Sequence, residues 1–589
     1  MEIKSLVKMN KDLNMKKKWI KCALVAILPM VATMPLPAKP LPSIALDVTI
    51  NKQQNALVKT MKAEKNWLLL PVKNGAPKQR VEIRVQGKPI RSFDIELADG
   101  QPDWYAYLDI RAWKGQQLEI TSNKENSKAL EGIKQNDQEL DAQQRYREPS
   151  RGLFHFSPKR GWNNDPNGLV FYQGEYHLFF QHNPYGAQWG NMHWGHAVSK
   201  DLVHWNEVGE ALYPDSFGTM FSGSGVVDAA HTSGFGTKDS PPMVVFYTAA
   251  EQSWTQGMAY SIDGKTFTKL GRPVVPKIQD GNRDPKVLWY EPGKHWVMVL
   301  YVTEPNEQHT MHFFTSTNMK DWKEASVLKG GKGNDRYLFE CPEFFELPIE
   351  GTQERKWILT GANSQYAIGS FDGYTFTPEI ERLNGQRGRD FYASQTYNNE
   401  PNGRRIEIGW WRTHTDGNGS CFNQSMSIPM ELKLVQTPKG PRLSRTPIAE
   451  LKQLRNKQVD VHAVSLKSGQ TFHAEGANAE ALEIRATLSP GNASMIHATV
   501  RGIDLFYNVA EQELSVDGVM AHAALSSEGK LDLTIYVDRT GLEIFANNGL
   551  CFMPINKNIP AESTGVSFEA EGGNAQCEQL AIYTLKSIW

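Results

Sequence analysis

Three acidic residues, Asp165, Asp284 and Glu340, stand at matching places in a unit that repeats along the chain. Each lies about 30–34 residues before a short segment that begins Ser-x-Asp or Ser-x-Asn and ends in Trp or Phe, a spacing that fits one structural repeat. The segments are SKDLVHW from Ser199, SIDGKTF from Ser261, STNMKDW from Ser316 and SFDGYTF from Ser370. Because one repeat position carries an acid three times, we expect the three carboxylates to meet in one place.

Carboxylates grouped in this way could cleave a glycosidic bond, where one attacks the acetal carbon and another protonates the leaving oxygen. Asp165 lies among asparagines in WNNDPNG, and hydrogen bonds from them would lower its pKa, as suits a nucleophile. Glu340 lies among phenylalanines in FECPEFFEL, and an apolar setting would raise its pKa, as suits a general acid. Asp284 follows Arg283, so it should stay ionised and accept hydrogen bonds from sugar hydroxyls.

The elements that must position these acids are strands. From Phe154 to about Leu432 the chain has strand-like runs such as YHLFFQ and HWVMVLYV and no long helical periodicity. The Ser-x-Asp/Asn segments recur at about 54–62 residues, and the roughly 280 residues involved would make five blades of a β-propeller. Because Asp-Gly pairs favour hairpin turns, we place each segment at an outer hairpin and each acid on or beside an innermost strand.

The flanking regions also predict β-structure. Residues 42–122 contain short strands separated by Gly and Pro, which indicates a small accessory β-domain. Residues 123–150 are polar and predict a linker with a short helix. Residues 151–445 would form the catalytic propeller, and residues 450–589 alternate strands and turns, as in a β-sandwich. The predicted fold is therefore all-β: a five-bladed propeller followed by a C-terminal β-sandwich, with an extra N-terminal β-domain.

Residues 1–38 have the pattern of a signal peptide. Lysines precede an apolar stretch from Cys22 to Met34, which is too short to span a membrane, and small residues follow it. The lysine cluster lies directly after Met15, so Met15 is an alternative start. We therefore expect an exported protein, either secreted, periplasmic or on the cell surface, with no membrane span.

Charge and cysteine content argue against several other classes. The formal net charge is −1, from 64 basic and 65 acidic residues, so no basic excess indicates a nucleic-acid partner. The four cysteines that follow the signal have no metal-binding spacing, and we expect free thiols, with a bridge between Cys551 and Cys577 as the alternative. We expect structural roles rather than metal binding for His155, His193 and His196, since no matching carboxylates accompany them.

WNNDPNG, RDP and ECP, in this order, resemble the signature motifs of glycoside hydrolase family 32, whose members act on β-fructofuranosides as invertases, inulinases and levanases. FFQHNP, QWGNMHWGH, FSGS, DFYASQ and GWW agree with this resemblance, which runs from about Phe154 to Trp589. The resemblance implies a five-bladed propeller with a β-sandwich. It makes Asp165 the nucleophile, Asp284 the transition-state stabiliser and Glu340 the acid/base.

The same resemblance implies a retaining double displacement, with the two reacting carboxyls ~5–5.5 Å apart and no metal or organic cofactor. The implied substrate is a fructan or fructooligosaccharide, and we expect release of terminal fructose by a monomer or simple homo-oligomer. The residues expected to bind substrate are Trp162, Asn163, Asn164, Gln181, Trp189, Phe221, Ser222, Arg283 and Trp411.

Other functions stay open at this point. Cleavage inside the fructan chain is the alternative to terminal release, because loop shape decides between them. The Ser-x-Asp-Gly segments resemble sialidase repeats, but the chain lacks a convincing arginine cluster with a tyrosine nucleophile. An inverting arabinanase-type enzyme would need more widely separated carboxylates. A non-catalytic fructan-binding propeller would be indicated by loss of one acid, and all three are present. The sequence gives no preference among levan, inulin and sucrose.

Overall fold

The computed structural model describes residues 57–124, 128–415, 417 and 419–589. The predicted signal peptide and the first part of the predicted accessory domain lie outside these residues. The described chain is built almost wholly from strands, which confirms the all-β class. Its helical elements are short 3₁₀ turns at Arg111–Trp113, Ala129–Gly132, Pro305–Glu307 and Ala449–Leu454. No helix in the described part of the chain has the length and apolarity needed to cross a bilayer.

The N-terminal region forms two small antiparallel sheets around one apolar core. The first sheet contains, in order, β1 (Leu57–Lys62), β6 (Gln117–Ser122), β3 (Gln79–Val85) and β4 (Lys88–Ile95). The second contains β5 (Trp104–Asp109), β2 (Trp67–Val72) and β7 (Lys134–Asn136). Strand β7 belongs to the segment expected to be a linker. Its pairing with Trp67–Leu69 of β2 therefore ties part of that segment to the N-terminal region.

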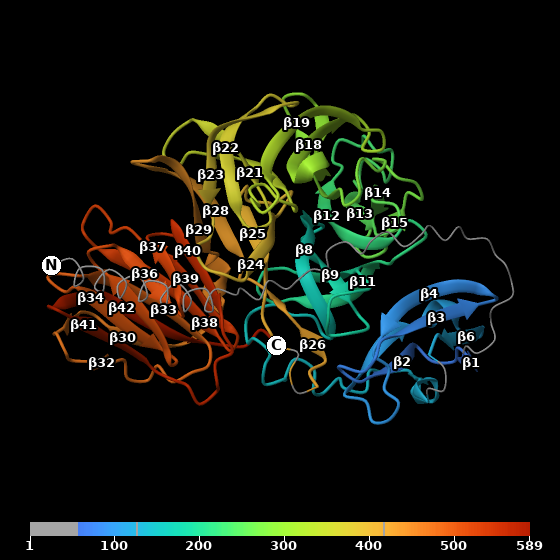
Figure 1. The fold of residues 1–589 in the computed structure, drawn as a ribbon, viewed down its shortest axis with the longest axis horizontal. Coiled ribbons are helices and arrows are strands. Elements are labelled where there is room, and N and C mark those ends of the chain that lie inside the picture. The colour runs from blue at the N-terminus through green and yellow to red at the C-terminus, as the bar shows by residue number, and fades with distance from the viewer. Residues whose placement is uncertain (1–56, 125–127, 416, 418) are drawn as a thin grey trace, which may run out of the picture. The chain divides into compact units, whose positions relative to one another are not determined.

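Five successive antiparallel sheets, each built on four main strands, follow between residues 161 and 447 (Figure 1). The first two contain β8 (Gly161–Tyr172), β9 (Glu175–Asn183), β10 (His193–Ser199) and β11 (Asn206–Leu212), then β12 (Thr219–Val227), β13 (Met243–Ala250), β14 (Thr255–Ser261) and β15 (Thr268–Lys269). The third and fourth contain β16 (Arg283–Tyr290), β17 (His295–Glu304), β18 (Gln308–Ser316) and β19 (Lys323–Lys332), then β20 (Glu343–Pro348), β21 (Arg355–Thr360), β22 (Gln365–Phe371) and β23 (Phe376–Asn384). The fifth contains β24 (Phe391–Thr396), β25 (Arg405–Trp411), β28 (Met430–Thr437) and β29 (Gly440–Pro447), with β27 (Ser425–Met426) beside β25. Strand β26 (Phe422–Asn423) joins the first sheet by pairing parallel to β8.

The first strands of these sheets lie beside one another. Strand β8 contacts β12 and β24, β12 contacts β16, and β20 contacts β24. Such contacts are expected of the inner strands of a propeller, and the number of sheets agrees with the predicted five blades.

The four repeated Ser-x-Asp/Asn segments connect the third and fourth strands of the first four sheets, as predicted for outer hairpins. In each segment one side-chain oxygen accepts hydrogen bonds of 2.7–3.0 Å from the backbone N–H groups two and three residues later. The accepting residues are Asp201, Asp263, Asn318 and Asp372. The repeat is thus a turn-forming device, since Asx side chains stabilise turns by accepting such bonds.

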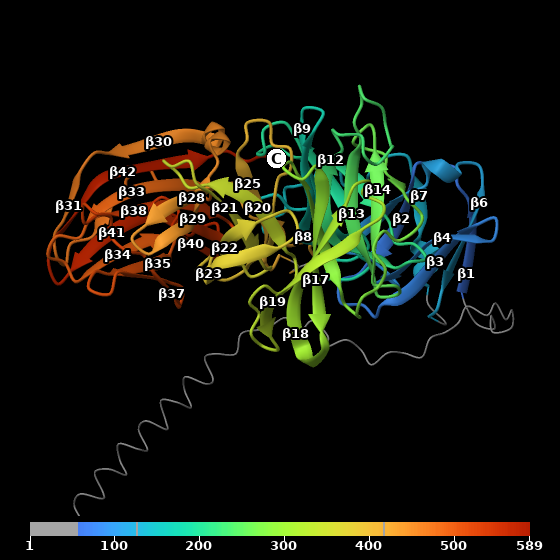
Figure 2. The same ribbon diagram turned by 90° about the horizontal axis from the view of Figure 1, so that it is seen from above.

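The C-terminal region is a β-sandwich whose two sheets enclose a single apolar core (Figures 1 and 2). One sheet contains β30 (Arg455–Val461), β42 (Ala575–Leu585), β33 (Leu482–Ser489), β38 (Leu531–Asp538), β39 (Gly541–Ala546) and β40 (Cys551–Asn556), with β31 (Val464–Leu466) paired to β42. The other contains β32 (Phe472–His473), β41 (Val566–Glu571), β34 (Met495–Val500), β35 (Ile503–Asn508), β36 (Glu513–Val516) and β37 (Val519–His522). Cys551 and Cys577 are buried free thiols, in agreement with the expected reduced state.

A buried polar cluster joins the sandwich to the chain that enters the first sheet. His155 has no exposed side-chain surface, and its Nδ1 and Nε2 each lie 2.8 Å from a carboxylate oxygen, of Asp538 and Glu543 respectively. This places His155 in a structural role, as expected. Among the described residues no group of His, Cys, Asp and Glu side chains is arranged to hold a metal ion.

Candidate active site

The three predicted acids converge although they come from different sheets. Asp165 lies on β8, Asp284 is the second residue of β16, and Glu340 lies just before β20. The Cys341 thiol joins two of them, with its Sγ 3.6 Å from Asp165 Oδ2 and 3.3 Å from Asp284 Oδ2. Arg283 joins the other pair, because it binds Glu340 and lies 3.8 Å from Asp284. The equal offsets in the sequence therefore reflect shared geometry.

The half-buried carboxylate of Asp165 is held by neutral donors, of which the Cys341 thiol is one. Ser222 Oγ donates a hydrogen bond of 2.7 Å to Oδ2, and Asn164 Nδ2 donates one of 3.0 Å to Oδ1. Trp162 Nε1 in turn donates to Asn164 Oδ1 at 2.9 Å, which fixes the orientation of the amide. These contacts hold the carboxylate in one rotamer without a direct cationic partner, an arrangement that suits a nucleophile.

Asp284 is deeply buried, with about 5% of its surface exposed. Its Oδ2 accepts a hydrogen bond of 2.9 Å from the Cys341 backbone N–H, and its own N–H donates to Thr248 Oγ1 at 3.0 Å. The second carboxylate oxygen accepts no described hydrogen bond, which leaves it free to bind a hydroxyl.

Glu340 has the strongest partners of the three acids. Its Oε2 accepts hydrogen bonds from Arg283 Nε at 3.0 Å and Nη2 at 2.7 Å. Its Oε1 accepts a hydrogen bond of 2.5 Å from the Tyr392 hydroxyl on β24. Both carboxylate oxygens are thereby fixed, so the orientation of this side chain is set by two neighbouring sheets.

The pKa directions expected from neighbouring residues in the sequence are wrong for Asp165 and Glu340, and Asp284, which was expected to stay ionised, also has a raised pKa. Burial raises the pKa of Asp165 despite the bonds from Ser222 and Asn164. Burial likewise raises the pKa of Asp284 to about 7, although Arg283 opposes the change. Burial also acts to raise the pKa of Glu340, but Arg283 and Tyr392 outweigh it and the net shift is downward.

The reason for the error at Glu340 is the direction of the nearby side chains. Phe344 and Phe345 enter two different apolar cores, while Phe339 packs under the guanidinium groups of Arg283 and Arg336. The surroundings of the acid therefore come from other sheets. The raised pKa values of Asp165 and Asp284 reflect first their burial and then repulsion between neighbouring carboxylates.

Two of these acids, and the cysteine that follows Glu340, have a left-handed backbone conformation. Asp284, Glu340 and Cys341 have φ values of 65°, 38° and 43°, in the left-handed region that residues with a Cβ seldom occupy. Such strain persists where surrounding contacts impose it and is common at active sites. The turn before β20 thus directs both the Glu340 side chain and the Cys341 N–H toward the other acids.

An aromatic rim lies beside the nucleophile. Trp189 is 39% exposed and meets Phe221 edge-to-face, with ring centroids 6.0 Å apart. Phe221 immediately precedes Ser222 on β12 and meets Trp254 in the same manner at 5.8 Å. Trp189 and Phe221 were predicted to bind substrate, and their placement beside the Asp165 donor is compatible with that role.

Three other predicted binding residues make no described hydrogen bond with the three acids. Gln181 is buried and donates to the Met220 carbonyl oxygen at 2.8 Å, so it supports β12. Asn163 is fully buried, and its amide has no hydrogen-bond partner in the described part of the chain. Trp411 is fully buried against the His155 ring, 4.1 Å away, so the prediction that it contacts sugar needs correction.

Sequence reasoning also missed residues. Trp410, next to Trp411, faces the opposite way. The centroid of its ring lies 6.0 Å from that of Trp162 and 6.3 Å from that of Tyr392. Because neighbouring side chains on a strand point to opposite faces, knowing the direction of one of these tryptophans would have given the direction of the other. Tyr392 lies in the DFYASQ motif, which agreed with the family resemblance but did not indicate Glu340 as the partner. Trp254 lies outside every quoted motif and gave no signal.

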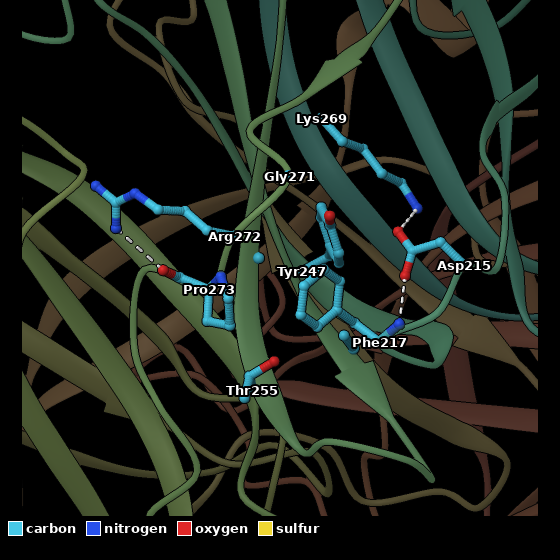
Figure 3. A pocket seen from close by; sticks show the side chains of 10 residues that line it. Asp215, Phe217, Tyr247, Thr255, Lys269, Gly271, Arg272 and Pro273 are labelled. Atoms are coloured by element: carbon cyan, nitrogen blue, oxygen red, sulfur yellow. Dashed lines mark hydrogen bonds and ion pairs between the residues drawn. The ribbon is translucent and has the colours of Figure 1, made fainter. Parts of the chain in front are cut away.

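A small cavity elsewhere is separate from this site. It has a volume of about 20 Å³ and lies in the second sheet, where Asp215, Tyr247, Lys269 and Pro273 are among the lining residues (Figure 3). A space of this size holds about one water molecule and is too small for a sugar. None of the three acids lines it.

The comparisons with known proteins agree with this geometry. Residues 155–447 match the family described as glycosyl hydrolases family 32 N-terminal domain, and residues 450–584 match glycosyl hydrolases family 32 C terminal. A levanase of Bacillus subtilis is 38% identical over 489 residues, covering 75% of this chain and 72% of the relative. An extracellular exo-inulinase of Aspergillus awamori is 30% identical, covering 75% of this chain and 96% of the relative.

Solved structures give the same result. The crystal structure of exo-inulinase from Aspergillus awamori has a TM-score of 0.67 at 29% identity and covers 75% of this chain and 100% of its own. That of a fructofuranosidase from Schwanniomyces occidentalis complexed with fructose has a TM-score of 0.66 at 25% identity, covering 75% and 99%. These matches define the class of protein: glycosidases with a catalytic β-domain and a C-terminal β-sandwich. The chain belongs to glycosyl hydrolases family 32.

Proposed function

We propose that this protein is a retaining glycosidase that hydrolyses β-fructofuranosidic bonds in fructans and releases terminal fructose. The observation that carries the proposal is the convergence of Asp165, Asp284 and Glu340 around Cys341 and Arg283. The levanase and exo-inulinase names of the relatives support the substrate class.

In the first step Asp165 attacks the anomeric carbon of the fructosyl unit, while Glu340 gives its proton to the leaving oxygen. A covalent fructosyl-enzyme forms, and Glu340, now ionised, takes a proton from water as that water attacks the same carbon. Asp165 is the leaving group of the second step. Asp284 binds hydroxyls of the fructosyl ring and strengthens those bonds as positive charge develops.

The first step needs a proton, and the buried group of acids favours keeping one. Burial raises the pKa values of Asp165 and Asp284, and repulsion from Glu340 adds to the effect, so the site favours keeping a proton. Because the acids titrate as a group, the proton can reside on Glu340 when a leaving oxygen displaces part of its interaction with Arg283.

A released-sugar assay on levan, inulin and sucrose tests the proposal. The intact protein should release fructose, and Asp165→Ala and Glu340→Ala should each abolish release. If the intact protein binds fructan without releasing any sugar, and Asp165→Ala binds as well, the protein is a binding module. Chromatography of early products separates the two cleavage modes: fructose alone supports terminal cleavage, and a ladder of oligosaccharides supports cleavage inside the chain.

We also propose that the protein is exported. The lysine-rich start and apolar stretch within residues 1–38 support this, as does the name of the extracellular relative. Fractionation of the native host with an antibody to the sandwich region tests it. Recovery of the processed chain outside the cytoplasm is expected, and recovery of the unprocessed chain within the cytoplasm would contradict it.

A further inference from the structure

The N-terminal region lies outside the residues matched by the two family descriptions, which begin at residue 155. Its strand β4 is an edge strand of its sheet, so one side of β4 has no neighbouring strand. Edge strands carry unpaired backbone N–H and C=O groups that must be satisfied in some other way. In β4 a group of contacts with the first propeller sheet serves this purpose.

The connection that receives β4 is the loop formed by residues 184–192, between β9 and β10. The side-chain amide of Asn191 binds the backbone of Asp94 in both directions, accepting from its N–H at 2.9 Å and donating to its carbonyl oxygen at 2.7 Å. This pair of bonds reproduces the pairing that a neighbouring strand would supply. Asn191 also donates to Asn183 Oδ1 at 3.0 Å, which ties the two ends of the loop together.

A ring stack anchors the other end of the loop. Phe93 and Tyr185 are each about 1% exposed and stack with centroids 3.7 Å apart and planes 13° apart. Tyr185 thereby becomes part of the apolar core of the N-terminal region, although it lies in the loop between β9 and β10. Arg91, two residues before Phe93, places its guanidinium 3.9 Å from the ring centroid of Tyr213 at the end of β11.

Trp189 lies between these two anchors. It is exposed, meets Phe221 edge-to-face, and Phe221 adjoins the Ser222 that donates to Asp165. We propose that the N-terminal region is a positioning element for the active site, in which β4 holds the 184–192 loop so that Trp189 forms a wall for the sugar next to the cleaved bond. This inference rests on the proposed fructan substrate. It assigns Phe93 and Asn191 as positioning residues, since neither touches the acids.

Kinetics of Phe93→Ala and Asn191→Ala on an inulin oligosaccharide test the inference. We expect KM to rise about three- to thirtyfold, the range of coupling through packed side chains, with kcat changed less than about twofold. The pH profile should not move, because the acids keep their partners. Phe93→Tyr retains an aromatic ring, so its KM should equal that of wild type.

Asn74→Ala is the matched control. It removes a different bond between the N-terminal region and the propeller, from Asn74 Nδ2 to the Ser420 carbonyl oxygen at 2.9 Å, and should leave KM unchanged.

A double-mutant cycle gives the sharper result. If the anchors act through Trp189, adding Phe93→Ala to Trp189→Ala should raise KM no further. An additive increase would overturn the inference, as would an unchanged KM in folded Phe93→Ala and Asn191→Ala. A loss of kcat alone would show a merely structural role and would also overturn it.

Hydrogen exchange keeps the inference separate from the proposed function. Peptides covering residues 184–192 should exchange faster in Asn191→Ala than in wild type or Asn74→Ala, whatever the enzyme hydrolyses. If wild type releases no sugar, the fructosidase proposal fails, and the positioning role is then decided by this exchange alone. Equal exchange in all three proteins would refute it.

Discussion

Two clusters of buried carboxylates in this protein contain similar side chains but differ in how their charge is balanced. Of the three catalytic acids, Glu340 and Asp284 share Arg283, Asp165 has no direct cationic partner, and the pKa of Asp284 is raised to about 7. In the cluster around His155, Asp538 receives hydrogen bonds from three backbone N–H groups and from His155, and its pKa is lowered. In the second cluster the pKa of Asp538 is lowered and His155 lies between two carboxylates, whereas in the first cluster two acids have raised pKa values.

This difference separates a functional site from a structural one. Burial penalises charge in both places, so the sign of the pKa shift depends on the partners. Burial acts to lower the pKa of His155, but the hydrogen bonds of its two ring nitrogens with Asp538 and Glu543 outweigh it and raise this pKa, so the charged form of the ring is stabilised. Among the catalytic acids, Asp284 has a carboxylate oxygen that accepts no described hydrogen bond, and a perturbed pKa combined with an available oxygen atom is typical of an active site.

The largest expected effect is on the catalytic cluster. Asp165→Ala removes the attacking carboxylate and should lower kcat on the order of 10⁴-fold or more, because loss of a nucleophile leaves only binding and electrostatic assistance. Steady-state release of fructose measures it, with thermal unfolding as the control for folding. A folded Asp165→Ala protein that keeps more than about a tenth of the activity would contradict the assigned role.

In the cluster around His155 we expect the opposite pattern, a loss of stability with little loss of activity. His155→Ala leaves two buried carboxylates without their shared partner and should lower the free energy of unfolding by about 3–5 kcal/mol. Activity per folded molecule, measured well below the unfolding temperature, should be nearly unchanged. Loss of activity without loss of stability would show that the comparison between the clusters is mistaken.

Asp284→Asn should separate stability from activity. An acid with a raised pKa in the folded state binds its proton more tightly when folded, so it reduces stability as the pH rises from its ordinary value near 3.8 through about 7. The variant should therefore equal wild type in stability near pH 4 and exceed it by about 1–3 kcal/mol near pH 8, while losing activity. Denaturant unfolding at both pH values measures this; an equal difference at both would contradict the raised pKa.

The smallest expected effect concerns Tyr392. Its hydroxyl stabilises the ionised form of Glu340, so Tyr392→Phe should raise the pKa of that acid. Because Glu340 must be protonated to act first, the alkaline limb of kcat/KM should move upward by about one pH unit or less. The pH profile of the variant is compared with that of Thr303→Val, which alters a hydroxyl bonded to Tyr301 instead. A downward movement would reverse the assigned donor role.

Much of this arrangement is predictable from the sequence because it is periodic. The Ser-x-Asp/Asn segments are local turns, so their spacing located the hairpins and hence the first strands that carry Asp165 and Asp284. The partners of Glu340 were not predictable in this way, since Arg283 and Tyr392 come from other sheets and only folding brings them together. Trp410 and Trp411 show the same limit, because adjacent strand residues point to opposite faces and the sequence does not say which face is which.

Covalent attachment of fructose to Asp165 is the central requirement of the proposed retaining mechanism. Glu340→Ala can be treated with β-fructofuranosyl fluoride, whose leaving group needs no acid, so the first step should proceed while the second lacks its base. Mass spectrometry of the acid-quenched protein should then find one fructosyl unit on the peptide that contains Asp165. Attachment to another residue, or steady turnover with no adduct and an inverted first product, would contradict the retaining mechanism.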